Sequence, residues 1–75
     1  MPTLKIINNA KVLVYFNDHP PPHVHIKLRD KRECMVDLAT FEINGLVPER
    51  EIRDVLAWIK ANPDFLYDEW QRCNP

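Results

Sequence analysis

The sequence predicts an α+β domain in which two C-terminal helices pack on one face of a four- or five-stranded antiparallel sheet. Short runs in the first half of the chain alternate apolar and polar residues, as strands do, whereas apolar residues in the second half recur at helical spacing. The chain has 75 residues, enough for one small domain and too few for two. We therefore expect a single domain over 1–75, with the sheet at roughly 3–43 and the helices at roughly 48–73.

The first predicted element is a β-hairpin. Apolar runs at 4–6 and 12–16 flank the Asn-Asn-Ala segment at 8–10, and Asn tolerates the left-handed backbone of a tight turn. A three-residue loop there would pair Ile6 with Val12, with the apolar sets of both strands on one face. A two-residue loop would instead pair Lys5 with Val12. Burial favours the three-residue loop.

The clearest strand covers residues 23–29, and a second follows at 33–38. Keeping both apolar sets on one face predicts a loop at 30–32, followed by a short edge strand at 41–43. The inward residues are then Val24, Ile26, Leu28, Cys34, Val36 and Leu38. The expected cross-strand pairs are Leu28 with Cys34, His25 with Asp37, and Arg29 with Glu33.

Two helices are predicted after the sheet. Pro48 suits a first helical turn, and the apolar residues that follow at i, i+3, i+4 and i+7 predict a helix over roughly 48–61. Asn62 then serves as an N-cap and Pro63 as the first residue of a second, short helix near the C-terminus.

Composition excludes some function classes. Ten Lys and Arg against eleven Asp and Glu give a formal charge of −1, which is atypical of a polybasic binder of nucleic acid or membranes. No apolar run approaches the roughly 20 residues that span a bilayer, and no signal peptide is visible. We expect a cytoplasmic protein without a membrane partner. Dimerisation would help so small a core, so a homodimer is one expected state.

All three histidines fall within the seven residues from His19 to His25, and three consecutive prolines lie between the first two. Prolines restrict the backbone and so limit where the His19 side chain can lie. His23 and His25 are two residues apart on one strand, so their imidazoles should lie side by side on the open face of the sheet. Such a pair can share a metal ion, a phosphate or a proton-transfer task.

This segment resembles the DhiT-like family of short bacterial proteins, a family of unknown function whose string His-x-Pro-Pro-His-x-His is matched from His19 to His25. The resemblance also includes Met1-Pro2-Thr3, Tyr15-Phe16 and the tryptophans Trp58 and Trp70. It implies the toxin-type component of a bacterial type II toxin–antitoxin system, with a cognate antitoxin protein as partner. Asn9 stands where many relatives carry Gly, which bears only on turn geometry.

One hypothesis is a metal-independent, ribonuclease-like site without a cofactor, since type II toxins often act on RNA. His19, His23 and His25 form its centre, with His23 and His25 exchanging protons with the substrate. Asp37 would orient His25, and Tyr15 would stack on a base or donate a proton. Phosphate would be held by four basic residues, Lys27, Arg29, Lys31 and Arg32. An ordinary polar sheet surface would carry the same residue types, so whether the protein is an enzyme stays open.

Two alternatives remain. The first is a divalent transition-metal site, for example for zinc, on His23 and His25 with His19 or Asp18 as third ligand. The second is a non-catalytic interaction module that uses the open face and an exposed strand edge to bind a partner protein.

Overall fold

The computed structural model describes residues 3–75; Met1 and Pro2 of the N-terminal motif lie outside them. A five-stranded antiparallel sheet has the sequential order β1-β2-β3-β4-β5 and is followed by two helices, so the predicted α+β arrangement is confirmed. The strands are β1 (Thr3–Ile7), β2 (Ala10–Leu13), β3 (His23–Leu28), β4 (Glu33–Asp37) and β5 (Ile43–Gly45). A 3-10 turn, η1 (Glu49–Glu51), precedes α1 (Arg53–Ala61) and α2 (Pro63–Cys73).

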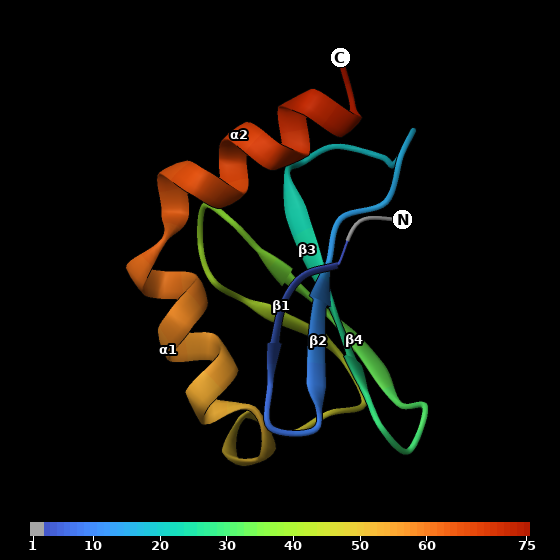
Figure 1. Ribbon diagram of the computed structural model, residues 1–75, viewed down its shortest axis with the longest axis vertical. Helices are drawn as coiled ribbons and strands as arrows, with labels where there is room; N and C mark the ends of the chain where they lie inside the picture. The colour runs from blue at the N-terminus through green and yellow to red at the C-terminus, as the bar shows by residue number, and fades with distance from the viewer. Residues whose placement is uncertain (1–2) are drawn as a thin grey trace.

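The core lies between the sheet and the two helices, which run along one side of the strands (Figure 1). Val24, Ile26 and Val36 of the sheet are fully buried with Ile59 and Leu66 of the helices. These are the residues that the alternation and the helical spacing place inward.

The helix boundaries differ from the prediction at two places. Residues 49–51 form a 3-10 turn, and Ile52 separates it from α1, so the first α-helix begins at Arg53 instead of Pro48. The Asn62 side chain caps no N–H of α2, contrary to prediction. Its amide instead donates to the Trp58 carbonyl at 2.8 Å and so closes the end of α1.

The register of the first hairpin was predicted wrongly. Lys5 pairs with Val12 across a two-residue turn, and Asn8 adopts the left-handed φ of 54° that tight hairpin turns favour. Ile7 therefore points toward the core, and Ile6 is 60% exposed. A bulge between Thr3 and Lys5 restores the inward direction of Leu4. Leu4 and Ile7 therefore both pack against the core in the register that simple alternation disfavours.

The register of the second hairpin also differs, by two residues. The predicted pairs of Leu28 with Cys34, His25 with Asp37 and Arg29 with Glu33 are wrong. The structure pairs Ile26 with Cys34, His23 with Asp37, His25 with Met35 and Lys27 with Glu33. The Leu28 N–H donates to the Arg32 carbonyl at 2.8 Å, so the loop covers 29–31 and is closed by Lys31 in a left-handed conformation, φ 75°. A shift of two leaves every residue on its predicted face.

The edge strand β5 lies two residues later than predicted and pairs with β4. Gly45 opposes Cys34 with φ 139°, a backbone conformation that other residues rarely adopt. Cys34 and Cys73 are both buried and free. Within residues 3–75, no helix has both the length and the apolar character needed to cross a bilayer.

Candidate metal centre on the outer face of the sheet

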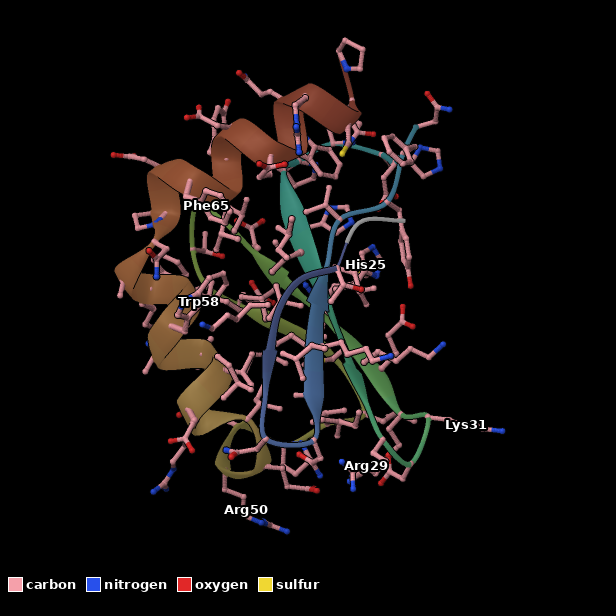
Figure 2. The ribbon with its side chains drawn as sticks, viewed as in Figure 1. His25, Arg29, Lys31, Arg50, Trp58 and Phe65 are labelled. Carbon is pink, nitrogen blue, oxygen red and sulfur yellow. The ribbon has the colours of Figure 1, made fainter. Side chains whose placement is uncertain are left out.

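The candidate site lies on the face of the sheet opposite the helices. Because Val24 and Ile26 are buried in the core, His23 and His25 project to the other side, and Figure 2 shows His25 on the side of the sheet away from α1. This face was expected to be open, but His25 is only 7% exposed. The Tyr15 ring covers it, with ring centroids 4.0 Å apart.

The two imidazoles lie close together, with ring centroids 5.0 Å apart, and both meet the carboxylate of Asp18. Asp18 Oδ2 lies 2.9 Å from His23 Nε2 and 2.9 Å from His25 Nε2. Each residue can offer one ligand atom such that all three atoms lie within 4.8 Å of one another. Asp18 reaches this position from the loop between β2 and β3. The ring centroid of Trp70 in α2 lies 4.8 Å from that of His23, so the C-terminal part of α2 reaches the edge of the site.

The Nδ1 contacts assign where each imidazole carries a proton. His23 Nδ1 lies 2.8 Å from the Pro21 carbonyl oxygen, which can only accept, so Nδ1 is the donor. His25 Nδ1 lies 3.1 Å from Glu33 Oε2, a carboxylate oxygen, and donates in the same way. In a neutral imidazole the electron pair then lies on Nε2, the atom that faces Asp18.

Three atoms that can each donate an electron pair therefore lie close together, and a positive charge among them would relieve their mutual repulsion. His25 Nε2 lies within hydrogen-bond distance of Asp18 Oδ2, at 2.9 Å. His23 Nε2 is buried and still has no hydrogen-bond partner, since its 2.9 Å approach to Asp18 lacks hydrogen-bond geometry. A single metal ion would satisfy all three atoms together.

The electrostatics favour an ionised Asp18 and a neutral Tyr15. Burial acts to raise the pKa of Asp18, but its side-chain contact with His25 and the hydrogen bond from the backbone N–H of His19 outweigh this effect, so the pKa lies below its usual value. Burial, together with the nearby Glu33 carboxylate, raises the pKa of Tyr15. The phenol thus keeps its proton and donates a hydrogen bond to Glu33 Oε2 at 3.2 Å.

Two predicted site residues lie outside this cluster. The His19 side chain is exposed, and only its backbone N–H contacts Asp18, at 2.8 Å. Asp37 makes no contact with His25, because its Oδ1 accepts the N–H groups of Ala39 and Thr40 at the end of β4. These backbone hydrogen bonds hold the pKa of Asp37 below its usual value.

The predicted phosphate-binding residues divide into two groups. Lys27, Arg29 and Lys31 line a hollow of about 550 Å³, which also includes Lys11, a residue the sequence analysis missed. Arg32 is directed elsewhere and pairs with Asp30 and Glu51. Figure 2 shows Arg29 and Lys31 near the β3–β4 turn, away from His25. Glu33 connects the two regions, because it contacts His25 and also lines the hollow.

Three residues important to the site were missed or given a lesser place by sequence reasoning. Asp18 was considered only as an alternative to His19, whereas its carboxylate meets both imidazoles. Glu33 was paired with Arg29 and instead contacts His25. Asn74 was not considered, although its side chain contacts the loop that carries Asp18.

Comparison with known proteins gives a family and no activity. No curated protein matches the chain, and no solved structure does. Residues 10–71 match the family described as domain of unknown function DUF4160, and the matched segment contains Asp18, His23 and His25. Because the match covers most of the 75 residues, the chain belongs to the DUF4160 family.

Proposed function

We propose that this protein binds a divalent transition-metal ion through Asp18 Oδ2, His23 Nε2 and His25 Nε2. The observation that carries the proposal is the convergence of these three electron-pair donors, one of which, His23 Nε2, is buried without a hydrogen-bond partner. Buried polar atoms are rarely left unpaired unless a ligand, ion or water satisfies them.

The ligand set selects the class of metal. Two imidazoles and one carboxylate suit zinc or ferrous iron, and three protein ligands leave coordination positions for water or a substrate. Pro21 and Glu33 accept the Nδ1 protons, the outer contacts by which proteins orient metal-binding histidines. A hollow of about 260 Å³, lined in part by Asp18 and His23, provides room for a small molecule beside the ligands.

Calorimetric titration with zinc tests the proposal. We expect one ion per chain in the wild type and a loss of affinity of at least about a hundredfold in Asp18→Ala, His23→Ala and His25→Ala. His19→Ala is the matched control, because its side chain lies outside the cluster, and should bind zinc within about threefold of the wild type. Absence of binding in the wild type, or an equal loss in His19→Ala, would exclude this site.

A second candidate is the toxin-type role in a bacterial toxin–antitoxin system, exerted on RNA in the cytoplasm and blocked by an antitoxin protein. The favouring observation is the hollow with Lys11, Lys27, Arg29 and Lys31, for which the described residues contain no ion-pair partner. Four cations on one hollow suit a phosphate backbone, and Glu33, which also lines the hollow, contacts His25, one of the two residues proposed for proton transfer.

Growth and cleavage assays test this candidate. Expressed without its antitoxin, the wild type should arrest bacterial growth and cleave RNA, and His25→Ala should do neither while remaining folded. Cleavage that survives a chelator would assign the metal-independent mechanism, and cleavage that is lost would assign the metal-dependent one. Growth arrest by folded His25→Ala would exclude a catalytic role of the histidines.

A further inference from the structure

We infer that Asn74 is a positioning residue that holds Asp18 in place as a metal ligand; this inference rests on the metal centre proposed above. The Asn74 side chain uses both its oxygen and its nitrogen. Oδ1 accepts the backbone N–H of Asp18 at 2.5 Å, and Nδ2 donates to the carbonyl oxygens of Tyr15 at 3.2 Å and Trp70 at 3.0 Å.

The loop that carries Asp18 needs such a support. Residues 14–22 lie between β2 and β3 and make no strand pairing, and Asn17 turns the chain with a left-handed φ of 56°. Figure 1 shows the C-terminal end of α2 beside this loop, and the Asn17 N–H reaches the Cys73 carbonyl at 3.5 Å. The loop is thus held against the C-terminal end of α2.

One amide group therefore controls two neighbours of His25. By binding the Asp18 N–H it fixes the backbone from which the Oδ2 ligand extends, and by binding the Tyr15 carbonyl it fixes the ring that covers His25. Metal affinity is sensitive to such outer contacts, whose loss typically weakens binding about 10–100-fold.

The chain contains an internal control for the helix-capping part of this role. Each helix ends in the sequence Trp-x-x-x-Asn-Pro, at 58–63 and at 70–75. In both, the Asn amide donates to the Trp carbonyl, at 2.8 Å for Asn62 and 3.0 Å for Asn74. Of the two, Asn74 also binds the site loop, so helix capping is shared and loop positioning is specific to Asn74.

The experiment compares Asn74→Ala with Asn62→Ala in the full chain by zinc calorimetry and thermal melting. Each variant loses a helix-end hydrogen bond, so both should lower the melting temperature. Zinc affinity should fall about 10–100-fold in Asn74→Ala and stay within about threefold of the wild type in Asn62→Ala. Equal affinities in the two variants would overturn the positioning role, because a merely structural residue would affect stability alone.

Hydrogen exchange at the Asp18 amide tests the same inference without metal. This proton should exchange about tenfold faster in Asn74→Ala than in Asn62→Ala, since it loses its acceptor. Equal exchange rates in the two variants would refute the positioning role of Asn74, whether or not the wild type binds zinc. Absence of zinc binding in the wild type would instead refute the metal centre. Should Asn74→Ala not fold, Asn74→Asp keeps an acceptor oxygen and loses both amide donors. It should keep the Asp18 amide protected while weakening zinc binding; exposure of that amide would contradict the inference.

Discussion

Zinc should stabilise the folded protein strongly, because the ligand atoms come together only on folding. Asp18 and His25 are seven residues apart, and the loop between them is held by the C-terminal end of α2. At a free zinc concentration of 100 times Kd, binding to the native state adds about 2.7 kcal/mol. Unfolding entropy of about 2.1 cal/mol/K per residue gives about 0.16 kcal/mol/K for 75 residues, so the melting temperature should rise by about 17 °C.

Thermal melts monitored by circular dichroism, with and without zinc, measure this rise. His19→Ala should show the full increase, whereas His25→Ala should show almost none at the same zinc concentration. A rise below about 3 °C in the wild type would refute the coupling of metal binding to this fold. A full rise in Asp18→Ala would show that zinc binds elsewhere on the chain.

Four further predictions concern stability and reactivity. Ile26→Ala, at a fully buried position of β3, should cost about 2–5 kcal/mol in urea unfolding; a cost below about 1 kcal/mol would contradict this packing. Because folding lowers the pKa of Asp18, its ionised carboxylate adds stability at pH values above the ordinary pKa of 3.8, and this stability is lost as the pH falls through the lower folded pKa. Asp18→Asn should therefore flatten the fall in stability below pH 3.8. An unchanged fall would argue against the histidine contacts. Gly45→Ala should destabilise by more than about 1 kcal/mol, because the new Cβ would lie 2.8 Å from Cys34 Cβ at a φ of 139°; an unchanged urea midpoint would contradict the close approach of β5. Burial raises the pKa of the Cys34 thiol, which should resist thiol reagents until the protein unfolds, and rapid labelling of the native state would show an open β4.

The faces of the strands and helices could be predicted from the sequence because burial is periodic. Val24, Ile26 and Leu28 were placed inward from alternation alone, and all three are buried. The apolar residues of α1 likewise face the core at helical spacing. This periodicity was also enough to place His23 and His25 together on the opposite side of the sheet.

Strand register could not be predicted by the same reasoning. A slip of two residues in the β3–β4 hairpin leaves every face unchanged, so hydrophobic patterning cannot detect it. The turn conformation decides the register, and here Lys31 adopts the left-handed conformation that Gly more often supplies. The error moved Asp37 opposite His25 in the prediction, whereas the structure places it opposite His23.

The third member of the candidate site depends on tertiary contacts. Asp18 and His19 are adjacent in sequence, and the spacing of the histidines favoured His19 as a partner. Which of the two side chains turns inward is set by the loop path, through the left-handed Asn17 and the contact with Asn74, 56 residues away in sequence. Local patterns carry no information on such a contact.

The most direct test of the central claim is the ¹⁵N NMR spectrum of the imidazoles with zinc bound. The structure predicts that Nδ1 of His23 and His25 stays protonated, since each faces an acceptor oxygen, and that zinc shifts both Nε2 resonances while those of His19 stay unchanged. Zinc-induced shifts at His19, or coordination through Nδ1 of His23 or His25, would contradict the convergence of Asp18, His23 and His25 on one metal ion.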